Sequence, residues 1–333
     1  MKARLAWQAP CLAALFALLA LLALSTLAAG SAAAQSWPTK PVRLISPFPP
    51  GSSADVMGRL FAPKLAEAFG QQFLVDNRAG AAGNIGAEAA ARSAPDGYTY
   101  LIEPSAIAST VSLYKDLTFN LERDFDAVAM LTTSSYVLVV SPKSPVKTVK
   151  ELITLARANP GKLNFASTGT GGAIHLTTAM FMMATGTQMV HVPYKGGLAA
   201  VADLNPGQID LMFATTQTLL PQVKSGRARA LAISTPVRSA AAPDIPTVAE
   251  AGVPGFESSA WLALVAPKGT PREAIARMNG TVGKIGQMPD VLERFNALGA
   301  EVQNMAPAQV AAFIHDEIAK WAKVVQAAGV TLE

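Results

Sequence analysis

Apolar and polar positions alternate along the chain in blocks that predict short strands followed by helices. The run at residues 41–48 has the length and apolar content of a buried strand. After it, apolar residues recur at the spacing of one helix face, at Val56, Leu60, Leu65 and Phe69. Because such strand–helix units repeat, the pattern predicts an α/β fold with a mostly parallel sheet that helices cover on both faces.

The same pattern predicts elements through the rest of the chain. Strands are expected at residues 41–48, 73–76, 98–102, 137–140, 163–166, 209–213, 228–234 and 261–267, with a strand and loop over 190–197. Helices are expected at residues 56–69, 148–158, 173–184, 198–204, 271–286, 288–297 and 306–328, with two more that end near 93 and 225.

A break in the middle of the chain predicts two lobes. Pro142 and Pro145 follow the β-branched run Val137–Val140, and the chain returns toward its first half near Trp261. We therefore expect one lobe from residues 35–138 and 257–333, and a second lobe from residues 139–256. Two strand–helix lobes of this kind leave a cleft between them.

The first residues have the three parts of a secretory signal peptide. Residues 1–34 contain a charged start, an apolar core over 11–24 and the small-residue cleavage site Ala32-Ala33-Ala34. We expect cleavage there, so that the protein is exported and the mature chain begins near Gln35. An uncleaved anchor is the alternative, because apolar residues continue over 11–29.

Composition excludes several classes of protein. The 333 residues carry a formal net charge of +4 and 15% charged residues, without a run of Lys or Arg, so nucleic-acid binding is not expected. The single cysteine, Cys11, lies in the predicted leader. The mature protein then has neither a disulfide framework nor a thiol nucleophile.

Two loops are suited to holding an anion. Phe48–Asp55 and Ser167–Gly172 each join a predicted strand to a predicted helix, and both consist largely of glycine and hydroxyl residues. A helix start exposes N–H groups and a partial positive charge, and glycine lets a ligand approach the backbone. We therefore expect each lobe to offer one helix start to a single ligand.

Other kinds of site receive little support. The spacing in Gly80-x-x-Gly83-x-x-Gly86 does not match a dinucleotide-binding fingerprint, so no cofactor is expected. His175, His191 and His315 lack the spacing of a zinc site, so no metal is expected. Ser167 with His175 is the only pair that suggests a hydrolase, and no nucleophile elbow accompanies it. The protein is therefore not expected to be an enzyme.

Three candidate features also have a structural interpretation. Asp55 is suited to the first turn of a helix through the helix dipole alone. His175 can be a packed or capping residue in the first turn of its helix. The glycine-rich run at 80–87 is explained either by close packing of a helix on a strand or by a backbone wall of the ligand cleft.

Ten segments along the mature chain carry a resemblance to a known family. These are Trp37–Pro41, Phe48–Asp55, Asn77–Gly86, Pro95–Thr99, Asp124-Phe125, Asn159–Lys162, Ser167–Leu176, His191–Gly197, Gly207–Phe213 and Pro246–Gly252. Together and in this order they resemble the Bug family of periplasmic solute receptors, the binding components of tripartite tricarboxylate transporters. The resemblance implies the two-lobed type II periplasmic-binding-protein (Venus flytrap) fold, which closes on its ligand in a central cleft.

The resemblance also implies where a ligand binds. Family members hold small carboxylates largely through backbone amides and waters from one loop per lobe, and those loops match the two selected above. The residues expected to bind ligand are Phe48, Gly51, Ser52, Ser53, Asp55, Ala81, Ser167, Thr168, Gly169, Thr170, Gly171, Gly172, His175 and Tyr194. Phe48, Tyr194 and Trp261 are the aromatic candidates for the pocket.

The chain departs from the family pattern at three places. The first loop carries Gly51-Ser52-Ser53-Ala54, which adds hydroxyl groups, and Ala179 occupies a position that is usually glutamate. An aspartate commonly follows the strand that ends at Phe213, whereas this chain has Ala214 and Thr215. If that aspartate meets a ligand amine, its loss disfavours amino acids as ligands.

The expected function is that of a monomeric periplasmic receptor. It would capture a small organic anion, a mono- or dicarboxylate, and deliver it to membrane permease subunits. Closure would be driven by contacts that only the closed form makes. A ligand-sensing receptor that docks on a membrane sensor kinase is the main alternative, and an exported enzyme on the same scaffold is a third.

Overall fold

The computed structural model describes residues 37–114, 117–194, 196–297 and 299–329. The chain divides into two units, Met1–Thr39 and Lys40–Glu333. The predicted leader, residues 1–34, lies outside the described residues. In the part that is described, no helix has both the length and the apolar character needed to cross a membrane.

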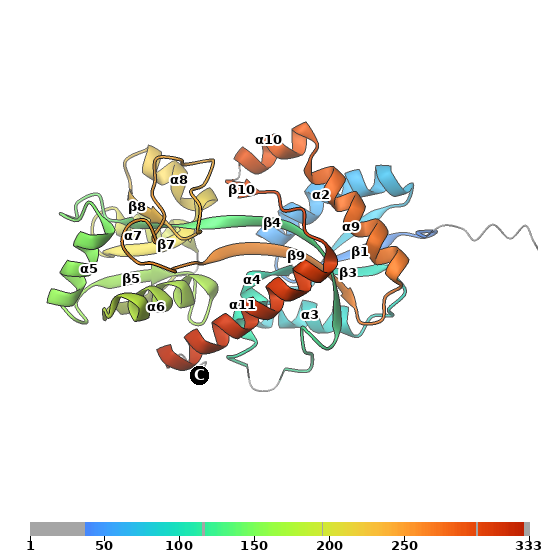
Figure 1. Ribbon diagram of the computed structural model, residues 1–333, viewed down its shortest axis with the longest axis horizontal. Coiled ribbons are helices and arrows are strands. Elements are labelled where there is room, and N and C mark those ends of the chain that lie inside the picture. The colour runs from blue at the N-terminus through green and yellow to red at the C-terminus, as the bar shows by residue number, and fades with distance from the viewer. Residues whose placement is uncertain (1–36, 115–116, 195, 298, 330–333) are drawn as a thin grey trace, which may run out of the picture. The chain divides into compact units, whose positions relative to one another are not determined.

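The helices and strands of the unit Lys40–Glu333 alternate for most of its length (Figure 1). The strands are β1 (Val42–Ser46), β2 (Phe73–Asn77), β3 (Thr99–Pro104), β4 (Phe125–Val140), β5 (Asn164–Ser167), β6 (Val190–Pro193), β7 (Leu211–Thr215), β8 (Arg229–Ile233), β9 (Ser259–Pro267) and β10 (Ala300–Glu301). The helices are α2 (Ser53–Phe69), η1 (Ala81–Gly83), α3 (Asn84–Ala91), α4 (Ser105–Thr110), α5 (Val149–Ala158), α6 (Ala173–Thr185), α7 (Gly197–Leu204), α8 (Thr216–Lys224), α9 (Arg272–Gly286), α10 (Pro289–Ala297) and α11 (Pro307–Ala328).

The strands form two sheet regions that share β4. In the first sheet the order is β2-β1-β3-β9-β4, with β10 beside β4, and in the second it is β4-β7-β5-β6, with β8 beside β4. Strand β4 pairs with β9 as far as Ser135 and with β7 from Tyr136 onward. The partner change lies close to the predicted crossing between lobes, although the exact lobe boundaries stay a prediction.

The predicted α/β class is confirmed, but the expectation of a mostly parallel sheet is wrong. Strands β1, β2 and β3 run parallel, as do β5, β6 and β7. By contrast, β4 is antiparallel to β7, β8, β9 and β10, and β3 is antiparallel to β9. The reason is that β4 leaves the first sheet and β9 returns to it, so the two strands run in opposite directions.

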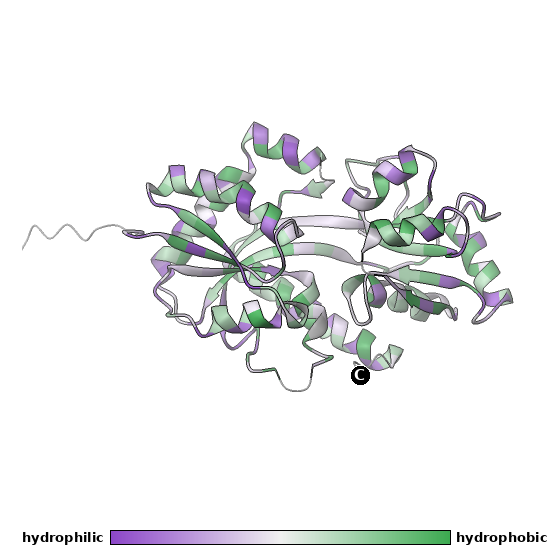
Figure 2. Ribbon diagram, turned by 180° about the vertical axis from the view of Figure 1, so that it is seen from behind, coloured by the Kyte–Doolittle hydropathy of each residue, from purple (hydrophilic) through white to green (hydrophobic). Residues whose placement is uncertain are grey.

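Helices cover both faces of the first sheet (Figure 1). Helix α2 packs on β1, β2 and β3 through Met57, Phe61 and Leu65, and it ends at Gly70, whose φ of 68° forms a left-handed C-cap. On the opposite face, α3, α4 and α11 enclose an apolar core that includes Ile107. The strands are largely hydrophobic and the helices carry both kinds of residue (Figure 2), as expected for amphipathic helices on a buried sheet.

Sequence patterns missed α4, β10 and most of β4. The apolar run of β4 is interrupted by Thr132–Ser135, so only its last residues had the pattern of a buried strand. Helix α4 has 6 residues, too few to display a helical period. Strand β10 has only 2 residues.

Helix α11 connects the two sheet regions. Its Trp321 and Val324 pack against Leu176 and Ala179 of α6 in the second region. In the first region, Glu317 of α11 accepts hydrogen bonds from the indole N–H of Trp261, at 2.9 Å, and of Trp321, at 3.1 Å. Lys320 also donates to this carboxylate. Buried Glu317 therefore joins β9 to the last helix.

Replacing Glu317 by Ala leaves two buried indole N–H groups without an acceptor. Since each unpaired buried donor costs roughly 1–3 kcal/mol, we expect the free energy of unfolding to fall by about 2–6 kcal/mol for the two donors. Urea denaturation monitored by circular dichroism measures this change. Glu293→Gln, on the exposed face of α10, is the control, and equal midpoints for the two variants would contradict the prediction.

Candidate functional site

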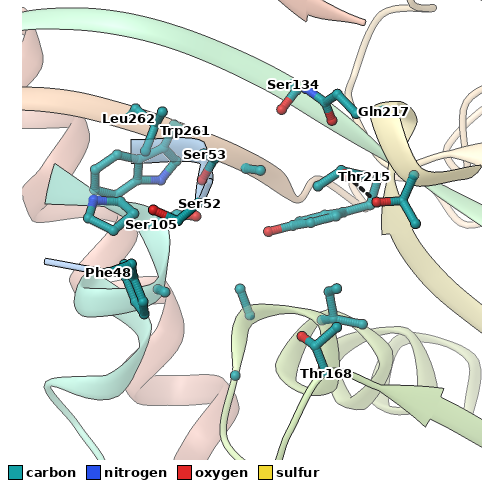
Figure 3. Close-up of a pocket in the computed structure, with 18 of the residues that line it drawn as sticks. Phe48, Ser52, Ser53, Ser105, Ser134, Thr168, Thr215, Gln217, Trp261 and Leu262 are labelled. Carbon is teal, nitrogen blue, oxygen red and sulfur yellow. Dashed lines mark hydrogen bonds between the residues drawn. The ribbon is translucent and has the colours of Figure 1, made fainter. Parts of the chain in front are cut away.

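A pocket of about 750 Å³ lies between the helix starts of the two sheet regions. Figure 3 shows Phe48, Ser52, Ser53, Ser105, Trp261 and Leu262 on one side of it, and Ser134, Thr168, Thr215 and Gln217 on the other. The remaining lining residues are Gly51, Val56, Met57, Pro104, Ala106, Tyr114, Thr132, Tyr136, Gly169, Thr170, Gly172, Ala173, Ile174, Thr218, Ala260 and Ala300. Its volume lies in the range of pockets that enclose small molecules.

Helices α2, α6 and α8 all begin at this pocket. The N-cap residues of α6 and α8, Gly172 and Thr215, make no side-chain hydrogen bond to the first turn. A helix start without such a cap leaves N–H groups for water or a ligand, and its dipole favours an anion. The starts of α6 and α8 therefore offer partial positive charge to the pocket without a basic side chain.

The first loop is held from behind by Asp55. The Asp55 carboxylate accepts a hydrogen bond from the Gly51 N–H at 2.9 Å, and the Ser52 hydroxyl oxygen accepts one from the Asp55 N–H at 3.3 Å. Arg59 donates to the same carboxylate at 3.0 Å. This hydrogen bond holds the pKa of Asp55 below its ordinary value, against the opposing effect of burial. Asp55 thus stays charged and fixes the loop.

The second loop is held from behind by Ser167 and two histidines. The Ser167 hydroxyl oxygen accepts a hydrogen bond from the Gly169 N–H at 3.1 Å and lies 2.6 Å from Nε2 of His191. Nδ1 of His175 accepts a hydrogen bond from the Gly171 N–H at 3.0 Å. The two imidazole rings stack with centroids 3.8 Å apart. These contacts determine how the backbone of the loop faces the pocket.

Burial keeps this histidine pair neutral. Burial first, and then the neighbouring His191, lower the pKa of His175 from 6.5 to about 4. Burial also lowers the pKa of His191. An Nδ1 that accepts the Gly171 N–H must be unprotonated, so the geometry and the lowered pKa agree.

Strand β4 supplies polar groups to the floor of the pocket. Thr132, Ser134 and Tyr136 all line it, because alternate residues of a strand point to the same side. Sequence analysis did not select them. The hydroxyl run Thr132–Ser135 interrupts the apolar strand, and which of its residues line the pocket became visible only once the strand was known to be continuous.

Eight of the fourteen predicted ligand-binding residues line the pocket. They are Phe48, Gly51, Ser52, Ser53, Thr168, Gly169, Thr170 and Gly172. The aromatic candidate Trp261 lines it as well. The structure therefore brings residues from the two predicted loops, which lie more than a hundred positions apart in the sequence, to one cavity.

The other six predicted residues lie outside the pocket lining. Asp55, Ser167, Gly171 and His175 hold the two loops from behind, as described above. The Tyr194 hydroxyl donates to Asp203 at 2.6 Å, and burial, followed by this hydrogen bond, raises the pKa of Tyr194 to about 12. Ala81 is exposed, with a φ of 45° in η1.

The glycine-rich run at 80–87 packs closely against its neighbours. A Cβ on Gly86 would lie 2.7 Å from Cα of Pro47 and 2.8 Å from the Arg78 carbonyl oxygen. A Cβ on Gly83 would lie 3.3 Å from the Phe48 ring. This geometry fits the packing interpretation of the run, and through Gly83 the run also supports a pocket residue.

The Ser167 hydroxyl does not have the surroundings of a nucleophile. Its side chain is buried, with 0% exposure, and is absent from the pocket lining. The histidine beside it is His191, whereas the sequence had suggested His175. In the described part of the chain, no group of three His, Cys, Asp or Glu residues is arranged to hold a metal.

Comparison with known proteins identifies the family. The family described as "Tripartite tricarboxylate transporter family receptor" matches residues 57–330. The chain belongs to this receptor family. The curated protein BugT of Bordetella pertussis is 39% identical over 307 residues, which cover 92% of this chain and 94% of BugT.

Solved structures of the same kind share the fold. A protein of R. palustris solved with adipate is 35% identical with a TM-score of 0.77, over 89% of this chain and 99% of that one. MatC from Rhodopseudomonas palustris, with bound malate, is 31% identical with a TM-score of 0.74, over 87% of this chain and 100% of that one. The predicted periplasmic-binding-protein fold and the Bug-type resemblance are therefore confirmed.

Acidification should weaken the protein through His175. Because the pKa of His175 is lowered in the folded state, the unfolded chain binds a proton at a higher pH than the folded protein does. The contribution of neutral His175 to the free energy of unfolding is therefore fully present above pH 6.5 and falls as the pH drops toward 4. We expect His175→Gln, which keeps an acceptor for the Gly171 N–H, to lose less stability between pH 7 and pH 5 than the unmodified protein. Thermal denaturation at both pH values measures the difference.

His315→Gln is the matched control for this prediction. Glu122 raises the pKa of His315 through a hydrogen bond, so this substitution should not reduce the loss at acidic pH. Identical acid sensitivity in His175→Gln and the unmodified protein would contradict the assignment.

Proposed function

We propose that this receptor binds a small organic carboxylate in the pocket between its two loops and presents it to permease subunits in the membrane. The observation that carries the proposal is the meeting of α2, α6 and α8 starts at one cavity. Helix starts bind anions through backbone N–H groups. The adipate and malate bound to the related proteins are carboxylates, which supports the same ligand class here.

Hydrogen bonding explains how such a site accepts a charge. Burying a carboxylate costs several kcal/mol unless its oxygens are hydrogen-bonded. The residues we propose for ligand contact are Gly51, Ser52 and Ser53 of the first loop, and Thr168, Gly169, Thr170 and Gly172 of the second. Backbone N–H groups and hydroxyls from both loops satisfy the oxygens together only when the loops face each other, so binding favours the closed form.

We further propose that the chain is exported and acts as a receptor without catalysis of its own. Residues 1–34 have the signal-peptide pattern, and the related receptors include a protein described as a periplasmic binding protein, BugD. The buried position of Ser167 favours a loop-supporting role over a nucleophilic one.

A thermal-shift screen of residues 35–333 tests the carboxylate class. A ligand present at about 100 times its Kd should raise the free energy of unfolding by about 2.7 kcal/mol. We expect carboxylates to raise the melting temperature and matched primary amides of the same acids to leave it unchanged. Co-purified ligand is removed first by unfolding and refolding. A shift with the amides alone, or with no member of the panel, would contradict the proposal.

Gly169→Val should abolish binding without unfolding the protein. Gly169 has a φ of 136° and a Cβ there would meet nothing within 4 Å, so the substitution strains only the backbone of the loop. We expect carboxylate affinity to fall by at least about tenfold. A distorted loop needs to weaken the free energy of binding by only roughly 1.4 kcal/mol to have that effect. Isothermal titration calorimetry measures the affinity.

Gly161→Val is the control for this loop substitution. Gly161 also has a positive φ, 69°, and open space at its Cβ position, but it is not part of the pocket lining. Retained affinity in Gly169→Val, or equal loss in both variants, would exclude the second loop as the binding element.

A further inference from the structure

The side chains around the pocket restrict what its ligand carries besides a carboxylate. Among the described residues that line it, none is Lys, Arg, His, Asp or Glu. Two carboxylates outside the lining already have partners, since Asp55 pairs with Arg59 and Glu317 binds the indoles of Trp261 and Trp321. A buried ammonium group would therefore lack a counter-ion here, which is costly in a desolvated site.

Aromatic rings give the pocket fixed apolar walls. Trp261 and Tyr136 are each only 2% exposed and line the pocket with Phe48 and Tyr114. The Trp261 ring is anchored by its hydrogen bond to Glu317. Phe48 and Tyr114 are partly exposed and offer ring surface to the pocket, which suits a ligand with a ring of its own.

Gln217 provides an unmatched acceptor on the wall opposite Trp261. Its side-chain oxygen, Oε1, is buried and has no hydrogen-bond partner in the described structure. Gln217 and Ser134 lie on the side of the pocket across from Trp261 and Phe48 (Figure 3). An unpaired buried acceptor disfavours a carboxylate next to it and favours a neutral O–H or N–H donor.

We propose that the pocket selects an acid with one carboxylate, an aromatic body and a neutral hydrogen-bond donor that reaches Gln217. The carboxylate is held by the loops, so this inference rests on the proposed function. The ring packs between the aromatic side chains, and the donor satisfies Oε1 of Gln217. Hydroxylated aryl alkanoic acids have all three features, whereas aliphatic dicarboxylates lack the ring and the donor, and amino acids add an uncompensated ammonium group.

Four compounds separate these features by calorimetric titration of refolded, ligand-free protein. They are para-hydroxyphenylpropanoate, phenylpropanoate, tyrosine and adipate. Tyrosine differs from the first only in its ammonium group, and phenylpropanoate differs only in the missing hydroxyl. We expect para-hydroxyphenylpropanoate to bind about tenfold more tightly than phenylpropanoate, since one hydrogen bond to a buried acceptor has that effect. Tyrosine and adipate should bind more weakly than both.

The variant Gln217→Leu tests whether Gln217 recognises the hydroxyl group of the ligand. This variant should bind both aryl acids with equal affinity, because the acceptor is gone while the ring contacts remain. Gln208→Leu is the matched control, since Gln208 is exposed and outside the pocket, and it should keep the tenfold preference. Unchanged binding of phenylpropanoate by Gln217→Leu shows that the variant is folded.

The outcomes distinguish this inference from the proposed function. Tighter binding of adipate or tyrosine than of para-hydroxyphenylpropanoate would overturn the inference and leave a carboxylate receptor. A hydroxyl preference that survives in Gln217→Leu would overturn the role of Gln217. Failure of every compound, in a protein that also shows no shift in the carboxylate screen, would overturn the proposed function itself.

Discussion

The arrangement of the molecule depends on one strand, β4, that is hydrogen-bonded in both sheets. Its pairing with β9 fixes it in the first sheet, and its pairing with β7 from Tyr136 to Val140 fixes it in the second. Because both ladders must be kept, the starts of α2 on one side and of α6 and α8 on the other face the same short stretch, Thr132–Tyr136. The polar side chains of that stretch then form the floor of the pocket.

Charged and ionisable groups lie outside the pocket lining and hold the residues of the lining in place. Asp55 and Arg59 hold the first loop, a neutral histidine pair holds the second, and Glu317 fixes Trp261. The surface that faces a ligand is left with backbone dipoles, hydroxyls and rings. Since dipoles held by a rigid scaffold need no rearrangement on binding, such a wall can accept an anion while Asp55, Arg59 and Glu317 keep their partners behind it.

The sequence predicted most of the regular elements and both loops, because each of these was encoded locally. Gly70 ended α2 as its pattern indicated, and glycine and hydroxyl residues marked the loops. The predictions that failed concern features that depend on residues far apart in the sequence. Polar Thr132–Ser135 concealed the continuity of β4, and the direction of β9 depends on a return from the second sheet. Asp55 and His175 were selected as ligand-binding residues because their positions beside the loops are visible in sequence, whereas their direction, away from the pocket, is not.

The pairing of β3 with β9 joins Leu101 to Val265, so the first sheet is completed by residues that are synthesised long after its first strands. Contacts between such distant positions have to wait for a large loop to close, and chains dominated by them fold slowly. Strands β1, β2 and β3 therefore remain without their neighbour β9 during most of synthesis. The first sheet can therefore be completed only once nearly the whole chain is present, which is compatible with the proposed export before folding ends.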